Sequence, residues 1–467
     1  MNRRYKMKFK RLLTLITEVL NKESDTKIDI SLTSQMASVI ELWSRMYENH
    51  PPWLVKDKVH TMGLPSAVAG ELSRLTLLEF ETGITGSVRA DMINESYHRV
   101  IHNLRTMLEY GCAKGGLILK PYVTQTGISV EFIQADAFFP IDFDSSNRMT
   151  KCVFASQIRK GNKIYTKLEM HEMSGGFLKI SNRAFVSTND FSLGSEISVA
   201  SVPEWSELSA AASFSGVDRL PFGYLKMPLA NNTDSTSPIG VSAYSKAVDQ
   251  IRVADKRYSQ IDWEFDSKET AVHIAESLLT YDPTRDKMVY PGGKERLYRE
   301  LEYASGATEK PLLDVFSPDI RDTSYYNGLN HQLRLVEFNC GLAYGTLSDP
   351  NNTDKTAEEI RSSKQRSFDF TKEIQKNLQI ALEDMIYAMD FYASIYNLAP
   401  YGNYDVTFNW GDSILADKEK ELLSMQQDAS LGFIRKELYI AKKYGVSEEE
   451  ALKMMPAVDT RFQIQEE

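Results

Sequence analysis

Apolar residues recur at helical spacing through the first part of the chain. From Leu12 to Leu108 they fall every three or four positions, as in MASVIELWSRMYENH and AGELSRLTLLEFETGI, and prolines at 51, 52 and 65 mark breaks. The start resembles a signal peptide, but Glu18 interrupts its apolar run and no small-residue cleavage site follows. The pattern therefore predicts a helical N-terminal region that opens on an amphipathic helix.

The spacing of apolar residues changes to every second position from Gly115. Turn sequences such as TQTG, RKGN and MSGG separate five runs rich in β-branched and aromatic residues: GGLILKPYV, ISVEFIQAD, TKCVFASQI, KIYTKLEMHEM and GFLKISNRAF. These runs predict a meander of antiparallel strands. Between about Val186 and Asp234 periodic stretches are few, which predicts loops around one short strand near FGYLKM.

A long helix is predicted from Ser237, an N-cap candidate that precedes Pro238, to about Lys268. Its apolar positions form one stripe: Tyr244, Val248, Ile251, Tyr258, Ile261 and Phe265. The stripe is narrower than the face that a core helix buries, which is typical of helices that lean on neighbouring helices. It indicates packing between copies of the chain; packing against the chain's own core is the alternative, and the pattern alone does not separate the two.

The second half of the chain alternates between short strands and helices. Residues 269–321 mix strand-like and turn sequences, and residues 322–341 form a shorter helical pattern that ends at Gly341 as a C-cap. A loop leads to a helical pattern over 355–396, which would reach about 60 Å if unbroken. We expect a kink or an oligomeric surface there, then a strand at YDVTFNWGD and a helical tail in which Ser447 and Glu450 form a capping box.

Composition narrows the class of protein. The 467 residues are 42% hydrophobic and 25% charged, enough for roughly two to four packed units. The formal net charge of −10 lacks the positive field of proteins that hold nucleic acid tightly. The three cysteines show neither CxxC nor zinc-ligand spacing, which favours a reducing compartment. No uncharged apolar run reaches the roughly 18 residues of a membrane span, so we expect no membrane partner.

Signatures of catalysis are missing from the sequence. It contains no GxxxxGK[ST] loop, HExxH, GxSxG elbow or GxGxxG between strand and helix. His98 and His102 have the spacing of a two-ligand metal face, but no third ligand accompanies them. We therefore expect no catalytic residue, metal or cofactor. One alternative is a hydrolase of unrecognised type built on Glu79, Glu81 and this histidine pair; another is a monomeric interaction scaffold of helices and a β-meander.

The order of these parts resembles the portal proteins of tailed bacteriophages, specifically the branch from long-tailed phages of Gram-positive hosts. The resemblance extends over nearly the whole chain. It is carried by WSRMYENHPPW, LPSAVAGELSRLTLLEFE, the strands from CAKGGLILKPYV to IQADAFFPIDFD, SPIGVSAYSKAVDQIRVADKRYSQIDWEF, GLAYGTLSD followed by DKTAEEIRSSKQRSF, and GFIRKELYIAKKYGVSEEEAL. None of these is a catalytic signature, so the match is one of pattern and order.

The resemblance implies an α+β fold with the portal architecture and a division of the chain into named parts. These are a wing of helices and β-meander (1–236), a first stem helix (237–268), a small α/β clip (269–321), a second stem helix (322–341), a tunnel loop (342–354), a long helix with a return to the wing (355–411), and a helical crown (412–467).

The resemblance also implies a function. About a dozen copies would form a homo-oligomeric ring at one capsid vertex, through which double-stranded DNA passes without sequence specificity during packaging and ejection. The implied partners are the major capsid and scaffolding proteins, the terminase motor and later a head-tail adaptor protein. The protein would reside in the virion, and in the host cytoplasm during assembly. An acidic channel wall fits this role, because many Lys and Arg contacts would hold the DNA.

Two sets of contact residues follow from the resemblance. The tunnel loop would touch DNA through mostly neutral polar groups: Tyr344, Thr346, Ser348, Asn351, Asn352 and Lys355. A basic cluster in the clip would meet partners: Arg285, Lys287, Lys294, Arg296 and Arg299. For the loop the alternative is an ordinary connection between helices, and for the cluster it is a solvated strand face.

Overall fold

Helices and mainly antiparallel sheets share the structure, as the sequence predicts, so the α+β class is confirmed. The computed structural model describes residues 9–23, 30–268, 271–275, 280–283, 287–289, 298–301, 313–316, 319–349, 357–411 and 418–455.

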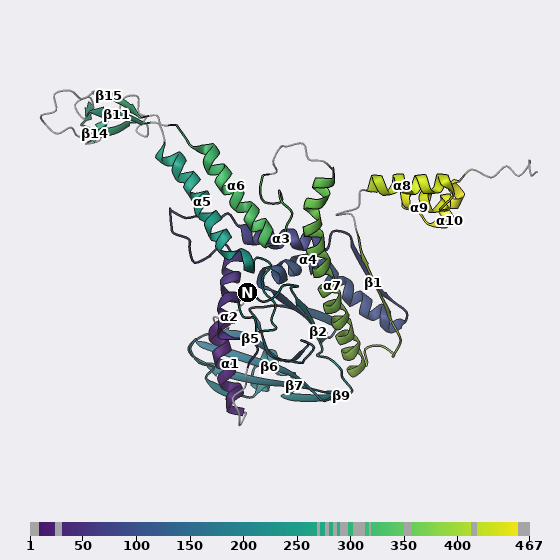
Figure 1. Cartoon of the computed structure of the whole chain (residues 1–467). Helices are drawn as coiled ribbons and strands as arrows, with labels where there is room; N and C mark the ends of the chain where they lie inside the picture. The colour runs from purple at the N-terminus through teal and green to yellow at the C-terminus, as the bar shows by residue number, and fades with distance from the viewer. Residues whose placement is uncertain are drawn as a thin grey trace, which may run out of the picture.

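Four helices form the N-terminal region: α1 (Phe9–Glu23), α2 (Ser34–Tyr47), α3 (Leu64–Thr76) and α4 (Val88–Lys114). The hydroxyls of Thr33 and Ser87 accept hydrogen bonds from the third amides of α2 and α4, which stabilises both starts. The predicted amphipathic helix is α1. This helix lies against the large sheet (Figure 1). Its buried Phe9 ring stacks on Phe139 of the sheet, with the ring centroids 4.8 Å apart.

Gly115 ends α4 and turns the chain into the first strand of the next sheet. Its φ of 90° is left-handed, and a Cβ there would lie 2.7 Å from the carbonyl oxygen of Gly240. The position therefore needs a glycine for both its backbone angle and its close packing.

The predicted meander is confirmed. The large sheet has the order β4-β5-β6-β7-β8, all antiparallel, and β9 also pairs with β7. Its strands are β4 (Phe138–Phe143), β5 (Met149–Lys160), β6 (Lys163–Ser174), β7 (Phe177–Ser187), β8 (Ser195–Ile197) and β9 (Ala211–Ser215). Two-residue turns with glycine join β5 to β6 and β6 to β7. A second sheet has the order β10-β2-β3: β10 (Gly223–Lys226), β2 (Gly116–Thr124) and β3 (Gly127–Gln134).

One strand lies where the sequence pattern predicted helix. β1 (Phe80–Thr85) falls inside the stretch that ends in EFETGI, yet it pairs antiparallel with β16 (Asp405–Trp410). The Phe80 ring stacks on Trp410 with centroids 4.0 Å apart. The partner strand lies more than 300 residues further along the chain, so local spacing could not indicate it.

The long predicted helix is unbroken. α7 (Ala357–Ile395) spans 39 residues and packs on β2 and β10, where Leu378, Leu382 and Met385 are buried. Figure 1 shows it crossing the molecule beside α3 and α4. We call α1–α4, the sheets of β1–β10 and β16, and α7 the body, because one continuous apolar core joins them.

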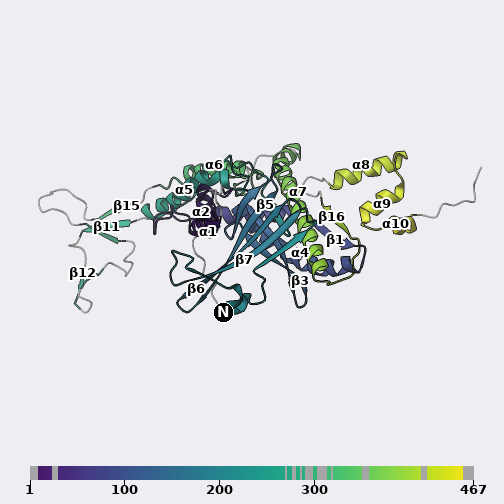
Figure 2. The same cartoon turned by 90° about the horizontal axis from the view of Figure 1, so that it is seen from below.

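Two further parts project from opposite sides of the body (Figures 1 and 2). The hairpin consists of α5 (Val248–Ser267) and α6 (Asp322–Asn339), which lie side by side. In the described part of the segment between them, the outer end carries the short strands β11 (Ala271–Ala275), β12 (Thr280–Asp282), β13 (Lys287–Val289), β14 (Tyr298–Leu301) and β15 (Leu313–Phe316). β11 is central between a parallel β14 and an antiparallel β15.

The C-terminal helices form the other projection: α8 (Lys418–Leu431), α9 (Lys436–Tyr444) and α10 (Glu448–Met454). The predicted capping box at the start of α10 is present. The Ser447 hydroxyl accepts from the Glu450 amide, and the Glu450 carboxylate accepts from the Ser447 amide.

The start of α5 corrects the sequence prediction. The helix begins at Val248, after a short 3₁₀ turn (Ser245–Ala247), and not at Ser237. The Ser237 hydroxyl instead donates to the carbonyl of Ser31 at 3.0 Å, and the Tyr244 hydroxyl donates to the carbonyl of Trp43 at 2.8 Å. Because these groups pair with the body, the segment stays irregular and the helix starts about three turns later than its proline suggested.

Candidate functional site

The hairpin is held together at three levels. At its base, Ile251 and Ala254 of α5 and Leu333 and Val336 of α6 belong to the apolar core. In the middle, the Arg257 guanidinium donates to the carbonyl of Gly328. These contacts join the two helices along their length and tie their base to the body.

An ion pair closes the outer end of the hairpin. The Arg321 guanidinium donates to both carboxylate oxygens of Glu264, at 3.1 Å from Nε and 2.9 Å from Nη2. The Arg321 hydrogen bonds lower the pKa of Glu264 to about 2. The pair sits where the hairpin meets the small strands, so it fixes the end of α5 against the start of α6.

The segment between α2 and α3 hydrogen-bonds to the middle of α5. Asp255 is fully buried, and its carboxylate accepts from the Trp53 indole at 2.8 Å and from the Met62 amide at 2.9 Å. One turn later, the Ser259 hydroxyl accepts from the His60 amide at 2.8 Å. Burial raises the pKa of Asp255. These hydrogen bonds fix the direction in which the hairpin leaves the body.

The residues of the predicted apolar stripe fall into a buried group and a more exposed group. Tyr244, Ile251 and Ile261 are buried inside the chain, so they do not form the contact surface predicted for them. The alternative of packing against the chain's own core holds for these three, because the base of the hairpin enters the body. Val248 is partly buried, whereas Tyr258 and Phe265 are exposed.

The hairpin exposes further apolar side chains that the stripe did not include. Trp263 is 70% exposed, and the α6 face adds more. The exposed apolar side chains of the hairpin are Tyr258, Trp263, Phe265, Tyr326, Leu335 and Phe338. We call this set the hairpin patch.

The loop after α6 folds back onto Glu337. α6 ends in a Schellman motif, in which Gly341 has a φ of 70° and the Leu342 amide donates to the Glu337 carbonyl at 2.9 Å. The buried Glu337 carboxylate then accepts four hydrogen bonds from the loop: Gly345 N at 3.1 Å, Leu347 N at 2.6 Å, Ser348 N at 2.8 Å and Ser348 Oγ at 2.8 Å. This carboxylate holds the loop in one conformation.

The conformation of this loop shows which of the predicted DNA-contacting residues are exposed and which are buried. Ser348 is buried with its hydroxyl on Glu337, which corrects the prediction that it touches DNA. Tyr344 is 49% exposed, and Thr346 is exposed with its hydroxyl on the Ala343 carbonyl at 2.7 Å. Asn351, Asn352 and Lys355 lie outside the described residues.

The predicted basic cluster is mostly outside the described part of the chain. Arg285, Lys294 and Arg296 fall there, while Lys287 and Arg299 are placed by their backbones on β13 and β14. Two acids that the sequence reasoning missed, Asp255 and Glu337, each follow a buried apolar residue by four positions on its helix. An acidic residue within the apolar stripe of a helix is the sequence signal that could have identified both.

The residues of the alternative hydrolase do not assemble into a site. His98 and His102 are exposed on α4, whereas Glu79, just before β1, and Glu81, within β1, are exposed there. Within the described ranges no group of His, Cys, Asp and Glu is arranged to hold a metal ion. Among those same residues, no helix combines the length and apolarity that crossing a bilayer requires.

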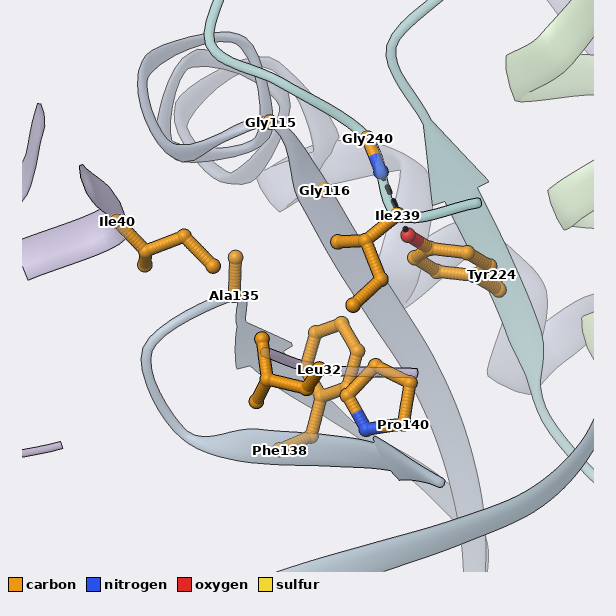
Figure 3. A pocket seen from close by; sticks show the side chains of 10 residues that line it. All are labelled: Leu32, Ile40, Gly115, Gly116, Ala135, Phe138, Pro140, Tyr224, Ile239 and Gly240. Carbon is orange, nitrogen blue, oxygen red and sulfur yellow. Dashed lines mark hydrogen bonds between the residues drawn. The ribbon is translucent and has the colours of Figure 1, made fainter. Parts of the chain in front are cut away.

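A small cavity lies between α2, the start of β2 and the extended segment before α5 (Figure 3). Its walls are mainly apolar, with Leu32, Ile40 and Phe138 facing Ile239, and the Tyr224 hydroxyl accepts from the Gly240 amide at 3.5 Å. Its volume is about 10 Å³, the space of about one water molecule. It is a packing defect and does not offer room for a substrate.

Comparisons with known proteins identify the family. No curated protein matches the chain. A solved structure described as "Neck of native GTA particle computed with C12 symmetry" resembles it with a TM-score of 0.40 and 11% identity, covering 82% of this chain and 91% of that chain. The family model described as "Phage portal protein, SPP1 Gp6-like" matches residues 96–457, which is most of the chain. The chain therefore belongs to the SPP1 Gp6-like family of phage portal proteins.

Proposed function

We propose that this portal protein forms a closed ring at one capsid vertex, through which double-stranded DNA is packaged and ejected. The family match over residues 96–457 is the observation that carries the proposal. A portal protein is a structural component of the phage and not an enzyme, which agrees with the scattered positions of the candidate hydrolase residues.

In this proposal the hairpin is the stem and its outer strands are the clip. The hairpin patch places aromatic side chains such as Trp263 and Phe265 on a projecting element, where the chain itself does not cover them. Exposed apolar patches mark contact surfaces, and aromatic residues are enriched in the buried centres of interfaces. A neighbouring copy on each side would cover them.

The body corresponds to the wing and the C-terminal helices to the crown. The clip would dock the terminase motor and then a head-tail adaptor protein, and Arg285, Lys287, Lys294, Arg296 and Arg299 remain its candidate contacts. The outer body would meet the major capsid and scaffolding proteins. The ring would thus assemble in the host cytoplasm and remain in the virion.

The loop after α6 would approach the DNA. Tyr344 and Thr346 are the exposed polar candidates in the described part of the loop, and Asn351, Asn352 and Lys355 remain candidates beyond it. Neutral hydroxyls bind phosphate oxygens without the counterion release that makes Lys and Arg contacts tight. With a net charge of −10 on each chain, the channel would let DNA slide.

Light scattering coupled to size-exclusion chromatography, with end-on electron micrographs, tests the proposal. We expect rings of about a dozen copies with a central hole. The double variant Trp263→Ser/Phe265→Ser should shift the protein toward smaller species, because it removes one exposed aromatic side chain from each of two faces of α5. The control Tyr122→Ser removes from β2 an aromatic side chain about as exposed as Phe265 and should leave the rings intact. A strict monomer at all salt and protein concentrations would favour the scaffold alternative instead.

A further inference from the structure

A single carboxylate inside the body binds cationic groups from two sheets. Glu169 of β6 accepts hydrogen bonds from the Lys120 ammonium and, at 3.0 Å, from the Lys167 ammonium. Its Oε1 also lies 2.8 Å from Nε2 of His171. Lys120 belongs to β2 of the second sheet, whereas the other three residues belong to β6 of the large sheet, so the contact joins the two sheets. We call these four residues the junction cluster.

The imidazole of His171 lies among aromatic rings. The residue is completely buried, and its ring centroid lies 5.3 Å from that of Phe154 and 5.8 Å from that of Phe222, both edge to face. Nε2 donates to Glu169, because an ionised carboxylate only accepts. Nδ1 has no hydrogen-bond partner within the described part of the chain. A proton on Nδ1 would therefore be a buried charged donor without an acceptor.

The junction cluster already holds more positive than negative charge. Two ammonium groups face one carboxylate while His171 is neutral. Burial lowers the pKa of His171, and the charges of Lys120 and Lys167 act in the same direction. Burial favours the neutral form of Glu169, but the charge of Lys120 and the hydrogen bond from His171 hold the pKa of this carboxyl well below its usual range. The closed cluster therefore favours an ionised Glu169 beside a neutral His171.

The titratable groups on the neighbouring elements stay neutral between about pH 5 and 8. Cys152 of β5 lies opposite His171 in the sheet, and burial raises the pKa of its thiol. On α7, burial and the charge of Glu169 raise the pKa of Tyr392. The residue opposite His171 on β7 is Ile180, which does not titrate. His171 is therefore the group of this region whose charge changes in that range.

We propose that His171 makes the junction between the two sheets sensitive to acid: when the junction opens, the imidazole takes up a proton that the closed cluster does not accommodate, and β2 separates from β6. The open state binds this proton more tightly than the closed state does. The closed junction is therefore fully stable above about pH 6.5 and loses stability as the pH falls below that value. The body is expected to be firm at neutral pH and looser in acid, a property that goes beyond the proposed channel.

Amide hydrogen exchange of the full-length chain at pH 7.5 and 5.5 tests the inference. Dividing each rate by that of an unstructured peptide at the same pH gives a protection factor, which reports opening alone. We expect the protection factors in β2 and β6 to fall about tenfold between the two pH values, because an imidazole of ordinary pKa becomes mostly protonated over this range. Unchanged protection in these strands would overturn the inference.

Two histidine variants assign the effect to one residue. His171→Phe removes the titrating group and keeps an aromatic ring beside Phe154 and Phe222, so its protection factors should differ by less than about twofold between the two pH values. The matched control His98→Phe replaces an exposed histidine of α4 and should keep the fall of about tenfold. An equal fall in both variants would show that another group is responsible, and the inference would be wrong.

A second measurement needs no variant and decides the question even if His171→Phe does not fold. The hydrogen on the carbon between the two imidazole nitrogens exchanges with deuterium at a rate that follows protonation of the ring, and mass spectrometry of peptides reads this rate. We expect the midpoint of His171 to lie below the ordinary value of 6.5. A midpoint at or above 6.5 would show that the closed cluster accepts the proton, which contradicts the inference. The junction lies within one chain, so this result is separate from the light-scattering test of the ring.

Discussion

The body and the two projections of this chain differ in how completely they bury their largest apolar side chains. In the body Trp43, Tyr97 and Phe139 are completely buried, and burial of a side chain of this size stabilises a fold by about 1.5–3 kcal/mol. In the hairpin and the C-terminal helices, Trp263 and Phe433 are mostly exposed. The difference teaches that the body is stabilised mainly from within, whereas the projections leave large apolar side chains uncovered, which the proposed ring would bury between neighbouring copies.

Buried ion pairs of the body differ from the ion pair at the outer end of the hairpin. The body encloses ion pairs, such as Lys114 with Asp136 at 2.9 Å and Lys120 with Glu169. The Glu264–Arg321 pair of the hairpin leaves the Arg321 side chain 64% exposed. Water and salt screen an exposed pair much more than a buried one, so its contribution to stability is smaller.

The largest expected effect comes from the buried Arg89 of the body. Its guanidinium binds the Asp390 carboxylate at 2.9 Å, the Ser394 hydroxyl at 2.6 Å and the carbonyl oxygens of Ala399 and Pro400. Arg89→Ala leaves these acceptors unpaired and should lower the free energy of unfolding by about 3–5 kcal/mol in urea titrations.

The matched control for that substitution lies on the same helix. Arg99 is an exposed residue of α4 whose pair with Glu95 spans 4.0 Å. Arg99→Ala should change the unfolding free energy by less than about 1 kcal/mol. Equal effects of the two substitutions would break the division between buried and exposed charges.

A pair of leucines tests the apolar side of the comparison. Leu72 of α3 is completely buried, and Leu72→Ala should lower the unfolding free energy by about 2–5 kcal/mol. Leu335 of the hairpin patch is 38% exposed, and Leu335→Ala should change the unassembled chain by about 0.5 kcal/mol or less. Urea titration of unassembled protein measures both, and light scattering should show that only Leu335→Ala weakens assembly without unfolding the chain.

The stability of the loop after α6 should be intermediate between that of the body and that of the projections, because one buried carboxylate, that of Glu337, holds it in place. Glu337→Gln replaces one carboxylate oxygen by a donor and removes the charge that attracts four loop hydrogens. We expect a loss of about 1–3 kcal/mol in local stability. Amide exchange at Gly345, Leu347 and Ser348 should accelerate accordingly, whereas exchange in the core of α4 should not change.

Ser348→Ala is the milder control for the loop. It removes only one of the four hydrogen bonds, so it should accelerate exchange less than Glu337→Gln does. If neither variant changes amide exchange, Glu337 does not hold the loop, and other contacts within the chain must order it.

The same division explains how much the sequence could predict. The strands from Gly116 to Ser187 follow from a two-residue period, because each faces its own core and pairs with its chain neighbour. α7 and the capping box of α10 follow from local spacing as well. These elements are set by contacts near in sequence, so their patterns are sufficient.

The errors arise where distant segments decide the conformation. Ser237 with Pro238 has the form of a helix start, but the Ser237 hydroxyl binds the Ser31 carbonyl and the segment stays irregular. The spacing of apolar residues around Phe80 to Thr85 predicts a helix, because the pattern does not reveal the partner strand β16. Tyr244 and Ile251 look like an exposed stripe until the body is placed around them. Local periodicity gives the apolar face of a helix, and it does not say which chain covers that face.

The smallest expected effect is the titration of Glu264 at the outer end of the hairpin. Its pKa of about 2 lies below the ordinary value of 4.5, because the Arg321 hydrogen bonds favour the ionised form. The stabilisation from this carboxylate is therefore complete above about pH 4.5 and is lost as the pH falls from 4.5 toward 2. Carbon-13 NMR of the carboxyl group, assigned by its disappearance in Glu264→Gln, measures the midpoint. Arg321→Met should return that midpoint to near 4.5, and an ordinary midpoint in the wild-type chain would show that the hairpin end is open. In that case the outer end of the hairpin would depend on neighbouring subunits, and the contrast with the body would be sharper still.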